Sequence, residues 1–206
     1  MPKIVDPAAR RAEIVDAVLR IVERDGLENA TLRAIAAESG LAIGSVRHYF
    51  TDHAEVMSVA MEELVDRLSA RILARVDAIN EPGADRQAGV EALLEEFLPL
   101  DDQRRLEAAA WLSFINAART EPRLRGYART MHEGTREIIG RVIARIGESG
   151  AVAEPFDTAA ETDRLAALID GLTLQGVHHP DLPGPAAMRR AIRHHLDSLL
   201  TKPGRA

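Results

Sequence analysis

The sequence has no cysteine among its 206 residues. Disulfide bonds, thiolate metal sites and catalytic thiols are therefore excluded, and a reducing compartment is the natural expectation. Long apolar runs are also missing, and Asp6, Glu13 and Asp16 interrupt the first stretch of the chain. We therefore predict neither a signal peptide nor a membrane-spanning helix, and we expect a soluble cytoplasmic protein.

Aromatic residues and positive charge are the next scarce features. Only 3% of the residues are aromatic, whereas alanine, leucine, arginine and glutamate are plentiful, which favours helices over sheets. The formal net charge of −6 argues against a protein that binds nucleic acid non-specifically along its length. Such binding depends on lysine and arginine residues that neutralise phosphates. The fold class is therefore predicted to be all-α, and any contact with DNA must be local.

Apolar residues recur three or four positions apart along most of the chain, which is the spacing of one helix face. Breakers such as the glycine and proline at residues 82–83 and the Pro-Gly-Pro at 183–185 separate these patterns. The sequence predicts about nine helices, which cover approximately residues 7–25, 31–38, 43–50, 53–80, 85–98, 102–120, 122–148, 157–177 and 185–201. Thr31 is expected to cap the second of them.

The segment 32–51 has the residue types of a helix-turn-helix. Four apolar residues are placed to hold its two helices crossed: Ile35, Leu41, Val46 and Tyr49. Ala36 is small where the helices approach closely, and Gly40 allows the turn. The second helix would present its outer face to a major groove, where Arg47 can grip a guanine at two positions. Glycine turns between helices are common, however, so the spacing alone leaves a helix pair without DNA binding open.

The block from Thr31 to Phe50, TLRAIAAESGLAIGSVRHYF, strongly resembles the N-terminal domain of TetR-family repressors. In that family a T-x-x-x-I-A helix, a G-[VLI] turn and a G-[ST]-x-x-x-Y-F recognition helix occur in this order. The resemblance implies a DNA-binding domain over residues 1–52 and a ligand-binding and dimerisation domain over residues 53–206. It implies operator contacts by Thr31, Arg33, Ala42, Ile43, Gly44, Ser45, Arg47, His48, Tyr49 and His53.

Thr31 and Tyr49 would hold phosphates in this arrangement, but three other positions depart from the family's pattern. The family usually has a small hydroxyl residue where Ala42 stands, and often lysine where Ile43 and His53 stand. We therefore expect one phosphate contact and some positive charge to be missing, and a contact by His53 would depend on pH. Positive charge would instead come from Lys3, Arg10, Arg11, Arg33 and Arg47.

The C-terminal part resembles the BetI-like subgroup, through the segments Trp111–Phe114 and Leu168–Gln175. The family implies that the last two helices form a four-helix dimer interface. The expected interface residues are Leu165, Leu168, Ile169, Met188, Ile192, Leu196 and Leu199. The alternative is that these apolar stripes pack within their own domain.

The family also implies a pocket for a small molecule among the fifth to eighth helices. Its expected lining residues are Leu64, Leu68, Phe97, Trp111, Phe114, Ile115, Tyr127, Met131, Leu172 and Gln175. Each of these is also compatible with plain core packing. Trp111 is the strongest candidate, because a single tryptophan in an aromatic-poor chain offers a large flat wall.

No arrangement of residues indicates catalysis, a metal site or a cofactor. The histidine pairs at 178–179 and 194–195 point in different directions on a helix, and we interpret them as solvated histidines at helix ends. The carboxylate pairs at 62–63, 95–96 and 101–102 are interpreted as exposed or capping. No serine has an evident histidine partner, and no glycine-rich phosphate loop occurs.

We therefore predict a regulator and not an enzyme: a homodimeric repressor that binds a palindromic operator and is released by a small-molecule effector. Two alternatives remain open at this point. One is an enzyme or carrier built on a helical bundle, which would not bind DNA. The other is an activator or architectural DNA-binding protein that ignores ligands.

Overall fold

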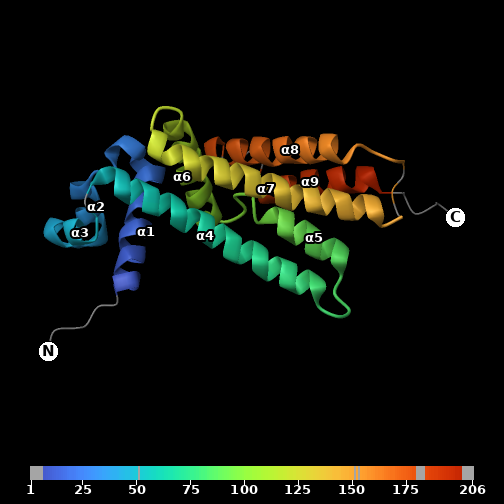
Figure 1. The fold of residues 1–206 in the computed structure, drawn as a ribbon, viewed down its shortest axis with the longest axis horizontal. Coiled ribbons are helices and arrows are strands. Elements are labelled where there is room, and N and C mark those ends of the chain that lie inside the picture. The colour runs from blue at the N-terminus through green and yellow to red at the C-terminus, as the bar shows by residue number, and fades with distance from the viewer. Residues whose placement is uncertain (1–6, 51, 151, 153, 180–183, 201–206) are drawn as a thin grey trace. The chain divides into compact units, whose positions relative to one another are not determined.

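The computed structural model describes residues 7–50, 52–150, 152, 154–179 and 184–200, so the predicted cation Lys3 lies outside the described residues. The described chain is helical throughout apart from its loops and one isolated β-bridge between Val152 and Leu200 (Figure 1). Its elements are α1 (Pro7–Asp25), η1 (Leu27–Asn29), α2 (Leu32–Ser39), α3 (Ile43–Tyr49), α4 (His53–Asn80), α5 (Arg86–Glu95), α6 (Asp102–Ala118), α7 (Pro122–Glu148), α8 (Thr158–His178) and α9 (Pro185–Leu199). The prediction of an all-α fold with about nine helices is confirmed.

Short polar side chains begin several of these helices. The Thr31 hydroxyl accepts a hydrogen bond from the Ala34 N–H at 3.2 Å, so the predicted cap of α2 is confirmed. Asp52 accepts from the Glu55 N–H at 2.8 Å ahead of α4. Such bonds satisfy backbone donors that a helix leaves unpaired in its first turn. Gly40 ends α2 with a φ of 69°, the left-handed conformation that glycine adopts most readily.

The chain divides into two compact units, which we describe separately. The first contains Met1–Arg67 and Leu106–Arg129, and the second contains Leu68–Arg105 and Thr130–Ala206. The division falls inside α4, α6 and α7. The two units are defined by contacts within the structure and not by function. The functional boundary between residues 52 and 53 therefore stays a prediction.

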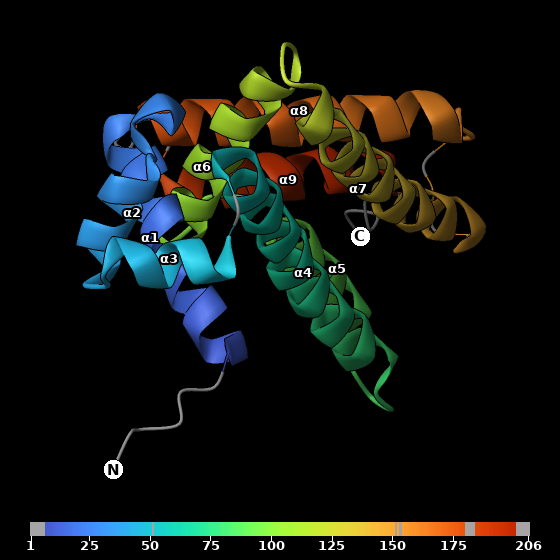
Figure 2. The ribbon, with the colours of Figure 1, turned by 60° about the vertical axis from the view of Figure 1, so that its left-hand side comes forward.

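The first unit is built around α1, which contributes seven buried apolar residues between Ile14 and Val22. In Figures 1 and 2, α2 lies against α1, and α3 lies against α2. Phe50 and Phe114 are fully buried in the same core. At the surface, Glu38 of α2 accepts hydrogen bonds from Arg20 and Arg24 of α1 at 2.9 and 3.1 Å. The small helices are therefore fixed to α1 by burial of apolar side chains, with the ion pairs as a minor addition.

The second unit buries residues from α4, α5, α7, α8 and α9 in one core. Gly176 of α8 marks a close approach, because a Cβ added there would lie 2.9 Å from the Pro99 Cγ. Two hydrogen bonds join the same region: Thr173 donates to the Phe97 carbonyl at 3.2 Å, and Arg105 donates to the Gly176 carbonyl at 3.1 Å. The glycine therefore lets α8 pack closely on the segment that follows α5.

Two polar residues expected at the surface are buried in the second unit. Glu96, which follows α5, is 6% exposed, and three arginines contact its carboxylate. The distances are 3.1 Å to Arg71, 2.7 Å to Arg75 and 3.4 Å to Arg104. Local spacing could not reveal this site, because two of its arginines lie on α4, more than 20 residues away. The interpretation as exposed or capping was therefore wrong for Glu96, whereas Glu95 is partly exposed.

His195 is the second correction, since it is 4% exposed rather than solvated at a helix end. Met188, Ile192 and His195 follow a spacing of four and three residues, which places the imidazole on the core side of α9. Its Nε2 lies 3.8 Å from a Glu161 carboxylate oxygen and has no hydrogen-bond partner among the described residues. The other three histidines of the two pairs are exposed, as expected.

The stability of this unit is expected to depend on pH through His195. Burial lowers the pKa of His195 below its ordinary value of 6.5, and Arg164 and His194 act in the same direction against the opposing effect of Glu161. The unfolded chain therefore takes up a proton at a higher pH than the folded chain, so stability is lost as pH falls through about 6.5. Urea unfolding at about pH 7.5 and about pH 5.5 measures this loss, which His195→Asn should remove. His194→Asn, at the exposed neighbour, should retain most of it, because burial is the main cause of the lowered pKa. Equal pH dependence in both variants would contradict the assignment.

Candidate DNA-binding surface

Helix α3 has one buried side and one open side. Val46 is fully buried on the inner side, together with Ile35 of α2. Leu41 and Tyr49 pack against the same core and are partly buried. The four apolar residues predicted to hold the two helices together therefore do so. Ala42 precedes α3 without a side-chain cap, so packing on the core is what fixes this helix.

The open side of α3 contains the residues predicted to face DNA. Its exposed members are Ile43, Gly44, Ser45, Arg47 and His48. The other predicted contact residues are also accessible: Thr31, Arg33, Ala42 and His53 are exposed, and Tyr49 is half-buried. The structure thus brings most of these side chains to one exposed helix and the residues beside it. Their contacts with DNA stay predictions.

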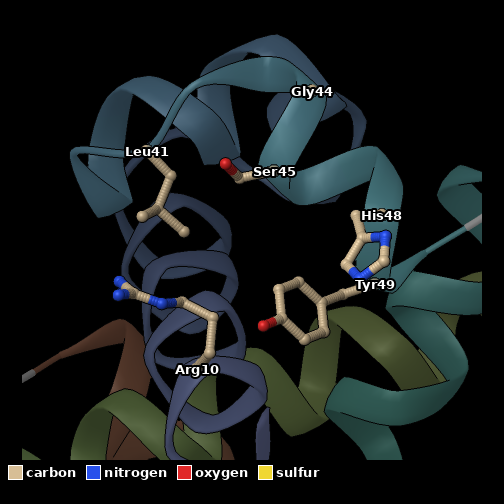
Figure 3. Close-up of a pocket in the computed structure, with 6 residues that line it drawn as sticks. All are labelled: Arg10, Leu41, Gly44, Ser45, His48 and Tyr49. Carbon is tan, nitrogen blue, oxygen red and sulfur yellow. The ribbon is translucent and has the colours of Figure 1, made fainter. Parts of the chain in front are cut away.

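A hollow of about 390 Å³ lies between α1 and α3 (Figure 3). Its lining residues are Arg10, Leu41, Gly44, Ser45, His48 and Tyr49. The rings of His48 and Tyr49 meet edge to face with their centroids 5.3 Å apart. Arg10 was expected only to add positive charge. Its place beside α3 depends on how α1 crosses the helix pair, which residue spacing does not encode.

Positive charge in the N-terminal region is confined to a few side chains, as expected for a chain with a net negative charge. Residues 1–52 have seven lysines and arginines and eight aspartates and glutamates. Arg20 and Arg24 are bound to Glu38, at the end of α1 away from the hollow. By contrast, Arg33 and Arg47 form no ion pair with any described residue. The two guanidinium groups are therefore available to an external anion.

Comparison with known proteins identifies the family. Residues 86–201 match the family described as "BetI-type transcriptional repressor, C-terminal". The regulator PksA of Bacillus subtilis is 30% identical over 199 residues, a match that covers 97% of this chain and 94% of PksA. The chain belongs to the TetR family. Its relatives are transcriptional regulators, so the predicted regulator is confirmed and the enzyme alternative is rejected.

Solved structures agree with this membership of the TetR family. A regulator from Saccharomonospora viridis, solved in complex with choline, has a TM-score of 0.83 and 23% identity, with 95% of this chain and 100% of that chain covered. The multidrug binding protein EbrR, complexed with malachite green, has a TM-score of 0.63 and 26% identity. That match covers 90% of this chain and 97% of EbrR. The likeness to the Saccharomonospora viridis regulator, at 23% identity, establishes the fold alone. That fold is the TetR fold.

The predicted effector-binding residues of this TetR-family protein fall in both compact units. Leu64, Trp111, Phe114, Ile115 and Tyr127 belong to the first unit, and Leu68, Phe97, Met131, Leu172 and Gln175 belong to the second. Within these units Leu64, Phe114 and Leu172 are buried, whereas Ile115 and Gln175 are exposed. The remaining five are partly buried. The effector pocket as a whole stays a prediction.

Trp111 and Tyr127 pack against the core of the first unit. The Tyr127 hydroxyl donates to a Glu62 carboxylate oxygen at 2.6 Å. This hydrogen bond raises the pKa of Tyr127, because ionisation of the phenol would remove the donor beside a negative charge. The Tyr127 hydroxyl is therefore engaged in a structural contact within the first unit.

Most of the residues predicted at the dimer interface are buried within the single chain. Leu165, Ile169, Met188, Ile192, Leu196 and Leu199 are all less than 9% exposed within the second unit of the single chain. Only Leu168 is partly accessible. Helices α8 and α9 lie side by side (Figure 1), and their apolar stripes are buried in the core of the second unit. The dimer interface through α8 and α9, with its contact residues, stays a prediction.

The described residues contain no group of three or more histidine, aspartate or glutamate side chains placed to bind a metal ion. Among the helices of that same part of the chain, none is long and apolar enough to cross a membrane.

Proposed function

We propose that this TetR-family protein represses transcription in the cytoplasm as a homodimer on a palindromic operator and leaves the DNA when a small molecule binds. The open side of α3 is the observation that carries this proposal. Arg47 and His48 project from a helix whose inner side is anchored by Val46. An anchored helix with unpaired donors on its outer side suits the major groove.

A dimer would place two copies of α3 on two half-sites. Two-fold symmetry of the protein then requires inverted half-sites, roughly 34–36 Å apart in the simplest arrangement. Occupancy of such a site would block transcription by excluding the polymerase. The description of the matching family as a repressor supports this direction of control.

Arg47→Ala is expected to relax the base preference at one base pair in each half-site. The loss of a two-pronged contact with guanine should weaken the preferred operator by about 1–3 kcal/mol per half-site. Binding selection on randomised operators measures the preference directly. If Arg47→Ala weakens all sequences equally and leaves the preferred site unchanged, Arg47 contacts the backbone and the reading of bases must come from elsewhere.

The effector is proposed to be an organic cation with an aromatic or alkyl body. Trp111 of α6 is half-buried against the core of the first unit. The face of an indole ring attracts a cation that is not strongly hydrated. The relative EbrR is complexed with malachite green, which is such a cation, and this supports the same class for the present chain.

Trp111 is the sole tryptophan, so its fluorescence should change when the effector binds. Trp111→Ala should weaken the effector response roughly tenfold, because the ring supplies both contact area and cation–π attraction worth about 1–2 kcal/mol. Operator affinity without effector should stay nearly unchanged. Titration of the wild type and Trp111→Ala with a neutral compound of similar shape tests the charge, since only the cation should lose a cation–π attraction. If Trp111→Ala loses folding and DNA binding together, Trp111 is core and this assignment fails.

A further inference from the structure

Ile43 is the first residue of α3, and its apolar side chain is 37% exposed. Among the described residues of the first unit, Ile115 of α6 is the one other large apolar side chain exposed to this degree. The attachment of α3 depends on Val46, which is fully buried, and on Leu41 and Tyr49, which pack against the same core. Contact of water with the exposed part of Ile43 is unfavourable, so an apolar group that covers it is bound favourably.

Ile43 and Arg47 share one face of α3, because they stand four residues apart on a helix. Both side chains are exposed. Ser45, His48 and Tyr49 line the hollow on another side of the same helix (Figure 3). The face that contains Ile43 is therefore distinct from the hollow, and it presents an apolar group one helical turn before a guanidinium.

The two neighbours of Ile43 in the chain have no polar side chain. Ala42 precedes α3 and is exposed, and a Cβ added to Gly44 would meet nothing within 4 Å. The edge of a base pair can therefore approach Ile43 without a competing side chain. The last turn of α3, by contrast, contains Arg47 and His48. The start of α3 is thus suited to apolar contact, and its end is suited to hydrogen bonding.

The C5-methyl group of thymine is the apolar group that base pairs present in the major groove. The N-terminal residues of a recognition helix are the ones that contact base edges. We propose that Ile43 packs against the C5-methyl group of a pyrimidine in each half-site and so determines specificity at that base pair. The proposal rests on the proposed function, because it needs α3 to enter a major groove. The departure from lysine at Ile43 then changes what the helix recognises, in addition to removing a charge.

The geometry of α3 also sets the position of the methylated base. Four residues correspond to about 6 Å along a helix, and successive base pairs are about 3.4 Å apart. When α3 lies along the groove, the thymine that meets Ile43 should therefore lie about two base pairs from the guanine proposed for Arg47. Binding selection on randomised operators should return a thymine at about this spacing in both half-sites.

Deoxyuridine in place of that thymine removes only the methyl group and tests the contact directly. Burial of one methyl group corresponds to about fourfold in affinity. The wild type should therefore lose about fourfold for each substituted half-site, and about fifteenfold when both are substituted. At the same position, 5-methylcytosine should bind about fourfold better than cytosine. Ile43→Ala should abolish both differences, whereas Ile43→Val should keep most of each.

Val76→Ala is the matched control, because Val76 is a β-branched residue of α4 with the same exposure of 37%. It should respond to deoxyuridine as strongly as the wild type does. Thermal melting confirms that each variant is folded. Each thymine of the selected operator is replaced singly, so that the response is located as well as measured.

The outcomes separate the methyl contact from the proposed function. If the wild type binds its operator and no deoxyuridine substitution weakens binding, the methyl contact is wrong and the proposed function stands. If Ile43→Ala still distinguishes thymine from deoxyuridine, another side chain or the shape of the DNA reads the methyl group, and the assignment to Ile43 is overturned. If the wild type binds no DNA, both fail.

Discussion

Replacing Leu168 and Leu174 of α8 with glutamate is expected to convert the protein into monomers. Leu174 is 48% exposed on a helix whose opposite face is buried in its own unit, and Leu168 is partly accessible. Buried charge at a subunit contact is strongly unfavourable. A monomer binds the operator through one DNA-binding domain and loses the gain in affinity that comes from linkage to a second. Operator affinity should therefore fall on the order of 10²–10⁴-fold.

Light-scattering mass measurement and operator titration check the two effects together. Leu73→Glu is the matched control, because Leu73 is 63% exposed on α4 and lies outside the proposed interface. It should leave both the mass and the operator affinity unchanged. A double variant that remains dimeric places the interface on other helices.

Glu96→Ala is expected to lower the free energy of unfolding by about 2–4 kcal/mol. Removal of this carboxylate leaves Arg71, Arg75 and Arg104 facing one another without their shared counter-charge. The arginine side chains are 19–46% exposed, so water screens part of the repulsion and the value lies below that of a fully buried pair. Urea unfolding measures the loss, which should shrink at high salt.

Glu137→Ala controls for the loss of a glutamate from a pair. Glu137 and Arg141 are 64% and 76% exposed, so this change should cost less than about 0.5 kcal/mol. Glu96→Gln preserves the shape of the side chain. Its free energy of unfolding should lie between those of the wild type and Glu96→Ala. If Glu96→Ala and Glu137→Ala unfold alike, the arginines around Glu96 are solvated independently of it.

The features that the sequence predicted correctly are local. The cap at Thr31, the turn at Gly40 and the inner face with Val46 depend on residues within a few positions of one another. The features that it missed depend on distant segments. Glu96 meets arginines from α4, and Arg10 reaches α3 across more than 30 residues of chain. Spacing along one helix contains no information about such neighbours.

The apolar stripes of α8 and α9 show a second limit of the same kind. Periodicity identified which face of each helix is buried, but it could not say what buries it. Leu165 and Ile192 satisfy the pattern by packing inside one chain, although the family resemblance assigned them to a contact between two chains. An apolar stripe specifies burial, and only the three-dimensional arrangement specifies the partner.

The separation of the two sides of α3 has a consequence for the divergence of such regulators. Stability at this helix depends on Val46 and its neighbours, whereas Arg47 and His48 make no ion pair within the described chain. Substitutions at exposed positions of this kind usually change folding stability by less than about 0.5 kcal/mol. Mutation can therefore explore new operator sequences at these positions while the scaffold stays folded, and a duplicated gene can acquire a separate set of targets without first acquiring a more stable protein.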